Sequence, residues 1–148
     1  MRLEWGWGYG GCGIIGNCSA VHQSSPVQVG TGTNWKQVCV SEGLATAIKT
    51  DGTLWTWGQN SFGQLGQGNT TYLSSPKQVG SLTTWATTFC GGSYVLATKT
   101  DGTLWTWGGN YYGQLGLNFL SNQRCNNYND WINVGMCLFN INTKYFSG

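Results

Sequence analysis

The chain has 148 residues, enough for one domain with a core of its own, and its formal net charge at pH 7 is +2. Only 8% of the residues are charged and 14% are aromatic, with 24 glycines and nine tryptophans, and this composition excludes a disordered chain. The lysines and arginines are scattered along the sequence, so we expect neither nucleic acid nor an anionic membrane surface as a partner. The excess of Gly, Thr and Trp over helix formers predicts strands and tight turns.

The N-terminal stretch MRLEWGWGYGG lacks the apolar segment of a signal peptide, and no later stretch is long and apolar enough for a membrane span. The compartment is therefore undetermined, with a virion or another extracellular assembly among the candidates. The same stretch contains Gly-x-Gly-x-x-Gly at 6–11, which is a dinucleotide fingerprint only between a strand and a helix. No helical pattern follows it, so we expect no bound nucleotide or other cofactor.

Nearly identical segments recur at a fixed distance: TDGTLWTWGQN at 50–60 and TDGTLWTWGGN at 100–110. A shift of 50 residues places 5–50 on 55–100 without a gap, and such a period marks a solenoid, a propeller or an array. We predict one repeat array over 1–148, divided into units 3–53, 54–103 and a degenerate 104–148. The third unit loses the pattern after Gly116, which indicates either a divergent capping repeat or a truncated or altered end.

Each unit contains a hairpin signal, the Asp-Gly dipeptides at 51–52 and 101–102. Asp-Gly favours a two-residue type I′ turn in which both residues have positive φ. Such a turn would place Ile48 opposite Trp55 and Thr46 opposite Trp57, with both tryptophans on one face. We predict hairpins over 45–58 and 95–108.

With two further short strands in each unit, the repeats form blades of four antiparallel strands. The predicted fold is therefore all-β, a partial β-propeller of about three blades. We expect Trp57 and Trp107 to be buried between neighbouring blades, because an indole pair fills the space between two packed sheets.

The segment DGTLWTWGQNSFGQLG at 51–66 resembles the signature of the regulator-of-chromosome-condensation repeat, whose units end in Trp-Gly-x-Asn-x-x-Gly-Gln-Leu-Gly. Residues 57–66 and 107–116 match this run completely, whereas 7–16 keeps only its first two residues and two later glycines. The family fold is a closed ring with more blades than this chain encodes. The resemblance implies a role as a nucleotide exchange factor for a small GTPase, as an inhibitor of β-lactamases, or as a repeat in a larger structural protein.

Catalytic and metal-binding groups are sparse. His22 is the only histidine, and the next unit has Tyr72 in its place, so we interpret it as a solvated loop residue rather than a catalytic base. Asp51 and Asp101 are expected to serve the turns, which leaves no pair of carboxylates for acid–base chemistry. The six cysteines form no Cys-x-x-Cys pattern and are interpreted as buried thiols, with a Cys12–Cys18 disulfide left open. We predict no enzyme activity, no metal and no cofactor.

Aromatic residues at variable repeat positions fall where the family exposes loops, and we take them as a candidate recognition surface: Tyr9, Phe62, Tyr72, Tyr94, Tyr111 and Tyr112. They favour a non-catalytic binding or structural module, a component of a larger protein or of an assembly such as a viral, phage or bacterial surface structure. The expected partners are protein subunits, either the rest of a longer propeller or further copies in an oligomer. Two alternatives stay open: a regulatory propeller acting as an exchange factor or enzyme inhibitor, and a carbohydrate-binding module that uses the aromatic side chains.

Overall fold

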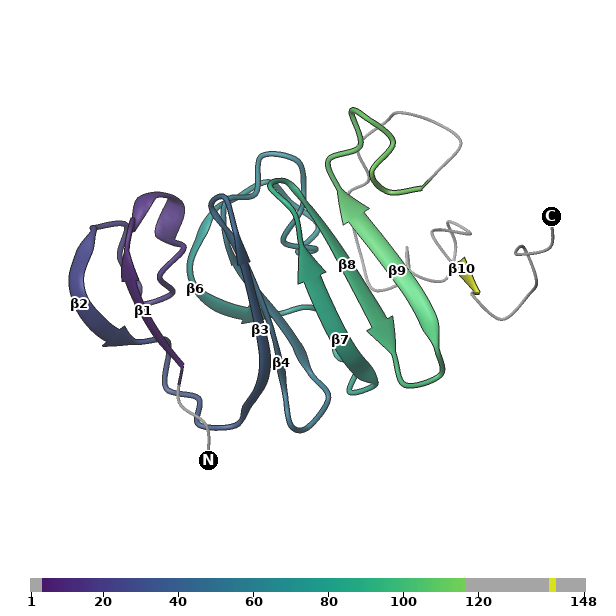
Figure 1. Cartoon of the computed structure of the whole chain (residues 1–148), viewed down its shortest axis with the longest axis horizontal. Helices are drawn as coiled ribbons and strands as arrows, with labels where there is room; N and C mark the ends of the chain where they lie inside the picture. The colour runs from purple at the N-terminus through teal and green to yellow at the C-terminus, as the bar shows by residue number, and fades with distance from the viewer. Residues whose placement is uncertain (1–3, 117–138, 141–148) are drawn as a thin grey trace, which may run out of the picture.

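The computed structural model describes residues 4–116 and 139–140, and their regular structure is β except for one short 3-10 turn, η1 (Gly11–Gly13). The strands form three antiparallel sheets that stand side by side (Figure 1). The first sheet pairs β1 with β2, the second has the order β3-β4-β5-β6, and the third has the order β10-β9-β8-β7. The all-β prediction is confirmed. No helix in this part of the chain has the length and hydropathy needed to cross a membrane.

The strand bounds follow the repeat closely. The first sheet consists of β1 (Trp5–Gly8) and β2 (Gln23–Gln28). The second consists of β3 (Trp35–Ser41), β4 (Leu44–Lys49), β5 (Leu54–Gly58) and β6 (Leu73–Gln78). The third consists of β7 (Trp85–Cys90), β8 (Tyr94–Lys99), β9 (Thr103–Gly108) and the two-residue β10 (Phe139–Asn140).

The two Asp-Gly hairpins form where they were predicted, but their turns are longer. The N–H of Lys49 donates to the carbonyl oxygen of Thr53 at 3.0 Å, so three residues lie in the loop rather than two. Gly52 has a φ of 79°, whereas Asp51 is not left-handed, and the predicted two-residue turn with both φ values positive is therefore wrong. The carboxylate of Asp51 accepts hydrogen bonds from the N–H and the hydroxyl of Thr53, at 3.0 and 2.6 Å. This local bonding favours a three-residue loop that ends in a left-handed glycine.

The longer turn moves the strand register by one residue. Trp55 lies opposite Ala47 and Trp57 opposite Ala45, rather than opposite Ile48 and Thr46 as expected. The second hairpin has the same register, with Trp105 opposite Ala97. A small partner across the strand leaves room for an indole on this face, so the register found here suits the tryptophans better than the predicted one.

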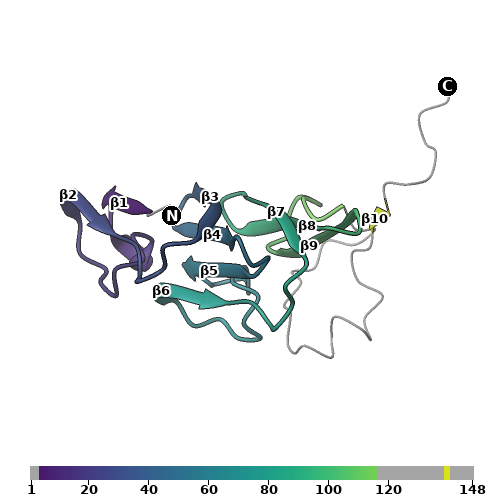
Figure 2. The ribbon, with the colours of Figure 1, turned by 90° about the horizontal axis from the view of Figure 1, so that it is seen from below.

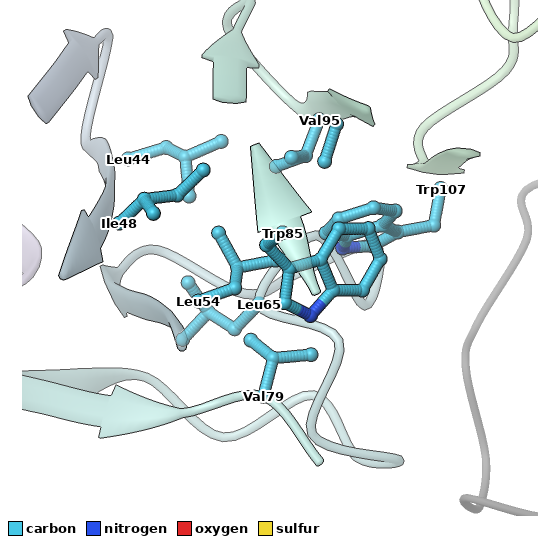
Figure 3. Close-up of a cluster of buried hydrophobic side chains, with 9 residues drawn as sticks. Leu44, Ile48, Leu54, Leu65, Val79, Trp85, Val95 and Trp107 are labelled. Carbon is cyan, nitrogen blue, oxygen red and sulfur yellow. The ribbon is translucent and has the colours of Figure 1, made fainter. Parts of the chain in front are cut away.

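Side chains alternate between the two faces of the second sheet, and each face has its own core. On the face toward the first sheet, Trp35 and Trp57 pack with Val29 and two alanines of β4. The opposite face packs against the third sheet in a cluster that contains Leu44, Ile48, Leu54, Leu65, Val79, Trp85, Val95, Ala97 and Trp107 (Figure 3). Both Trp57 and Trp107 are buried between neighbouring sheets, which confirms the role predicted for them.

Neighbouring sheets also meet along their first strands. Gln37 in β3 donates through Nε2 to the carbonyl oxygen of Thr88 in β7 at 2.8 Å and accepts from the N–H of Thr88 at 3.1 Å. The hydroxyl of Thr88 donates to the hydroxyl oxygen of Thr46 in β4 at 3.0 Å. Figure 2 shows the second sheet running from β3 to β6 away from this contact. First strands that converge while later strands lie outward are the arrangement of adjacent propeller blades.

The sheets and the sequence units are offset by two strands. Residues 3–53 supply β1 and β2 to the first sheet and β3 and β4 to the second, and residues 54–103 repeat this one sheet further on. Consecutive units therefore share a sheet. The division into units 3–53, 54–103 and 104–148 stays a prediction about the sequence, and most of the divergent end after Gly116 lies outside the described residues.

Candidate interaction surfaces

The loops that follow β5 and β9 are each built around a buried asparagine, Asn60 and Asn110. Oδ1 of Asn60 accepts from the N–H of Leu65 at 2.9 Å, and Nδ2 donates to two backbone carbonyl groups later in the same connection. The hydroxyl of Thr56 in β5 donates to the carbonyl oxygen of Leu65 at 2.7 Å. The loop after β9 has the corresponding bonds of Asn110 and Thr106 to Leu115, at 3.0 and 3.1 Å. The repeated motif thus folds each loop back against the end of its own strand.

The loop after β1 and the loop after β5 each receive a tryptophan from the next blade. Nε1 of Trp57 donates to the carbonyl oxygen of Ile14 at 2.7 Å, and Nε1 of Trp107 donates to that of Gln64 at 2.9 Å. Ile14 and Gln64 occupy the same repeat position. A Cβ added to Gly66 would approach Nε1 of Trp107 to 3.1 Å, so glycine at this position leaves space for the indole. The motif therefore joins one blade to the next.

All six predicted recognition residues lie at one end of the blades. Gly58 at the end of β5 pairs with Leu44 at the start of β4 and with Leu73 at the start of β6, and Gly108 pairs with Tyr94 in the third sheet. The segments next to these positions form what we call the loop rim, the upper edge in Figure 1. The loop rim carries Tyr9, Phe62, Tyr72, Tyr94, Tyr111 and Tyr112.

Three of these aromatic residues are joined by contacts around the second and third sheets. Phe62 packs edge-on against Tyr111 with ring centroids 5.4 Å apart, which connects the loops of two blades. The hydroxyl groups of Tyr72 and Ser61 lie 2.6 Å apart, so Tyr72 is held beside the loop that carries Phe62. Tyr112 follows Tyr111 and is 94% exposed. Their part in recognition stays a prediction.

The other two predicted residues are placed differently. Tyr9 is exposed on the first sheet, where its ring lies 4.9 Å from that of His22. Tyr94 is half-buried and lies over Gly91, where an added Cβ would overlap its ring. The structure thus brings Phe62, Tyr72 and Tyr111 together and leaves Tyr9 one blade away.

The first sheet has an uncovered side to which the sequence analysis assigned no residues. Trp5 and Trp7 stand at the repeat positions of Trp55 and Trp57, yet they are 50% and 62% exposed, against 2% for Trp57. They line a hollow of about 460 Å³ together with residues of β3 that include Val38 and Val40. Because Trp57 of β5 lines this hollow as well, the hollow lies between the first and second sheets. The repeat alignment contains a signal for Trp5 and Trp7, because it assigns them to the positions of Trp55 and Trp57.

Asp51 and Asp101 each accept hydrogen bonds within the turn of their hairpin. Hydrogen bonds from Thr53 and Thr103 hold the pKa values of Asp51 and Asp101 below their usual range. Burial lowers the pKa of Lys99, whose Nζ lies 3.8 Å from the ring centroid of Trp105. Within residues 4–116 and 139–140, no group of three or more His, Cys, Asp and Glu side chains could hold a metal ion.

His22 and the cysteines also take structural positions. Nδ1 of His22 accepts a hydrogen bond from the N–H of Gly10 at 3.0 Å, and its ring is exposed as expected for a loop residue. Cys12 and Cys18 are free thiols, so the disulfide left open for them is not formed. The thiol of Cys90 in β7 donates to Sγ of Cys39 in β3 at 2.9 Å, and burial raises the pKa of Cys90. Cys12, Cys39 and Cys90 are only partly buried and Cys18 is exposed, so the interpretation as buried thiols is wrong for Cys18 and holds only in part for the other three.

Two family models described as the regulator of chromosome condensation (RCC1) repeat match the chain, one over 51–98 and the other over 35–64 and 86–114. Together they cover residues 35–114, which is more than half of the sequence. A model described as Primase C terminal 2 matches 116–147, almost wholly outside the described residues. No curated protein sequence matches the chain.

The fold is similar to that of several solved structures. Human WBSCR16 matches with a TM-score of 0.71 at 23% identity, over 82% of this chain and 32% of that one. Yeast RCC1 (Prp20), solved with Kap60 bound to it, matches with a TM-score of 0.68 at 16% identity, over 82% and 31%. Prp20p from Saccharomyces cerevisiae, in a structure whose description names its binding properties to Gsp1p and histones, matches with a TM-score of 0.65 at 17% identity, over 82% and 32%.

Sequence identities this low establish a shared fold and nothing further. The similarity to the yeast RCC1 structures confirms the partial β-propeller predicted from the sequence. The chain spans about a third of the length of the three proteins.

Proposed function

Because the chain belongs to the regulator of chromosome condensation (RCC1) repeat family, we propose that it is a non-catalytic protein-binding module that contacts its partner through the loop rim. The observation that carries this proposal is the group of aromatic side chains on the rim of the second and third sheets, where Phe62 and Tyr111 join two loops beside the exposed Tyr112. Aromatic side chains presented by rigid loops are the usual anchors of protein interfaces.

The rigidity comes from the asparagine-centred loops below these side chains. Asn60 and Asn110 hold their loops through bonds to Leu65 and Leu115, whose side chains are buried. The backbone of the rim is thus organised before a partner arrives, and binding then costs mainly side-chain ordering. The residues at the tips, in contrast, differ between repeats, which allows the rim to be specific for one partner.

In this proposal the module is a component of a larger protein or assembly, since the chain spans about a third of the propellers it matches. The kind of assembly suggested by the low charge and the richness in Thr, Asn and Gly is a surface structure of a virus, phage or bacterium. That suggestion stays a prediction from composition.

The second candidate is a regulatory propeller, an exchange factor or an enzyme inhibitor. It is favoured by the similar yeast proteins, one solved with Kap60 bound and the other described with its binding to Gsp1p and histones. The same loop rim would then contact a GTPase or a hydrolase. The third candidate function is a carbohydrate-binding module, because exposed aromatic rings also stack on sugars.

Site-specific photo-crosslinking tests the proposal. A photoreactive phenylalanine at position 112 is on the loop rim, and the same group at Thr100, which is exposed in the turn at the other end of the third sheet, is the matched control. We expect one protein from the native source to be crosslinked at 112 and not at 100. Removing the rings with Tyr111→Ser and Tyr112→Ser should weaken binding of that protein at least about tenfold with unchanged melting.

The identity of the crosslinked protein separates the candidates. Accelerated nucleotide release from a GTPase, or dose-dependent loss of a hydrolase activity, would select the regulatory role. Binding on a glycan array that is lost with the same two substitutions, without a protein crosslink, would select the carbohydrate module. Equal crosslinking at 112 and 100 would contradict recognition through the loop rim.

A further inference from the structure

Two cysteine side chains from neighbouring blades lie against each other. Cys39 belongs to β3 of the second sheet, and Cys90 is the last residue of β7 in the third sheet. The thiol of Cys90 donates to Sγ of Cys39 at 2.9 Å, and the N–H of Cys90 donates to the same sulfur at 3.1 Å. Both residues are free thiols. The sulfur atoms of a disulfide lie about 2 Å apart, so these two need to approach by only about 1 Å to form one.

The strands that carry the two thiols are held in register by polar contacts. Two residues before Cys39, the amide of Gln37 donates to the carbonyl oxygen of Thr88 at 2.8 Å and accepts from the N–H of Thr88 at 3.1 Å. Thr88 lies two residues before Cys90, and its hydroxyl donates to that of Thr46 at 3.0 Å. The alignment of β3 with β7 is therefore fixed beside the sulfurs, and a bond between them would join two strands that already lie at a suitable distance.

The thiol pair is not part of the repeated framework. A shift of 50 residues places Cys39 on Phe89 and Val40 on Cys90. Phe89 and Val40 are 55% and 62% exposed, whereas both cysteines are partly buried. Since each position holds another residue type in the other unit, the formation of a blade does not require cysteine there. The two thiols thus meet through the particular residues of β3 and β7.

The two sulfurs differ in their surroundings, and this sets the order in which they react. Burial raises the pKa of Cys90, and its thiol proton is directed at Cys39. Sγ of Cys39 accepts two hydrogen bonds, so a negative charge formed on this sulfur would face two donors. The thiolate is the form that attacks a disulfide. Cys39 is therefore the attacking sulfur, and Cys90 is the second to react.

We infer that Cys39 and Cys90 form a modification site, an inter-blade disulfide made by exchange with a small-molecule disulfide. The thiolate of Cys39 attacks one sulfur of the small disulfide, whose S–S bond breaks and releases one small thiolate. Cys90 then gives up its proton to solvent and attacks Sγ of Cys39, which expels the second small thiolate as the protein disulfide forms. The two protein thiols are oxidised, the small disulfide is reduced to two thiols, and the two protons lost by the protein balance those gained by the thiolates.

The disulfide would link the second and third sheets between residues 51 positions apart. A link over this distance removes many conformations from the unfolded chain and so stabilises the folded one. The inference goes beyond the proposed function and does not depend on it, because no step involves the loop rim or a partner.

The test uses oxidised glutathione as the probe, added to the folded full chain and to the chain unfolded in urea. Free thiols are then alkylated, and trypsin releases Cys39 in peptide 37–49 and Cys90 in peptide 78–99, neither of which contains another cysteine. Mass spectrometry should find these two peptides joined, with a yield at least about tenfold higher from the folded than from the unfolded chain. The oxidised chain should also melt at least about 5 °C above the reduced chain.

Two single substitutions test the order of the steps. In Cys90→Ser, Cys39 should retain one glutathione as a mixed disulfide, whereas in Cys39→Ser the thiol of Cys90 should stay free. Cys18→Ser is the matched control, because Cys18 is exposed and lies outside the pair, and it should form the link like the native chain.

A folded native chain without the joined peptides would overturn the inference, and this measurement needs no substitution. So would as much glutathione on Cys90 in Cys39→Ser as on Cys39 in Cys90→Ser, because the order of attack would then be wrong. A linked chain that melts below the reduced one would also contradict the inference, since the link would then distort the contact between β3 and β7.

Discussion

Trp107→Ala and Trp7→Ala remove the same side chain from the same repeat position, and we expect them to change the free energy of unfolding by very different amounts. Trp107 is 1% exposed, belongs to the cluster between the second and third sheets, and donates a hydrogen bond to Gln64 at 2.9 Å. Truncating a buried tryptophan costs about 3–5 kcal/mol, which includes the cavity left behind. Trp7 is mostly in contact with solvent, so its truncation should cost about 1 kcal/mol or less.

Urea unfolding followed by far-UV circular dichroism measures both values. Trp107→Phe is the matched control for the hydrogen bond, because it keeps an aromatic ring and removes the Nε1 donor. We expect it to lie between the native chain and Trp107→Ala. Equal urea midpoints for Trp107→Ala and Trp7→Ala would refute the assignment of Trp107 to the inter-blade core.

Gly102→Ala should cost about 1 kcal/mol of backbone strain, because φ is 82° and an added Cβ meets no atom within 4 Å. Gly52→Ala should cost clearly more, because the added Cβ would overlap the carbonyl oxygen of Thr83; similar urea midpoints for the two variants would contradict this. Hydrogen bonds from Thr53 hold the pKa of Asp51 below its ordinary value of 3.8. These bonds therefore stabilise the folded state fully above pH 3.8, and the stabilisation is lost as the pH falls toward the folded-state pKa. The Tm of Asp51→Ala should therefore fall less than the Tm of the native chain between about pH 5 and about pH 2. An equal fall in Tm for the two proteins would contradict a stabilising role of the ionised Asp51. Burial raises the pKa of Cys90, whereas Cys18 is exposed, so a thiol reagent should label Cys18 in the folded protein and Cys90 only after unfolding. Mass spectrometry of the labelled peptides measures this, and labelling of Cys90 before Cys18 would contradict the prediction.

The sequence predicted the blades because the information for them is local or periodic. The gapless shift of 50 residues identifies Trp57 and Trp107 as equivalent, and burial between sheets follows from that equivalence. The turn was predicted wrongly because Asp-Gly is compatible with loops of two and of three residues. The deciding bonds come from Thr53, next to the dipeptide, whose hydroxyl and N–H both reach the Asp51 carboxylate.

The loop rim was predicted only in part, for a different physical reason. Variable aromatic residues at loop positions could be identified from the repeat alignment. Which of them meet depends on how neighbouring blades are set against each other, and the contact of Phe62 with Tyr111 joins residues of two blades. The hydrogen bond accepted by the carbonyl oxygen of Gln64 could not be predicted from the sequence either, because its donor Trp107 is 43 positions away and belongs to the next blade.

The repeat separates assembly from recognition. Residues that join blades recur from unit to unit, as the equivalent contacts of Trp57 with Ile14 and of Trp107 with Gln64 show. The loop rim differs from unit to unit, as Tyr9, Gln59 and Gly109 at one repeat position show. In the proposed function, specificity for a partner therefore resides in the loop rim, where side chains can change without disturbing the contacts that hold the blades together.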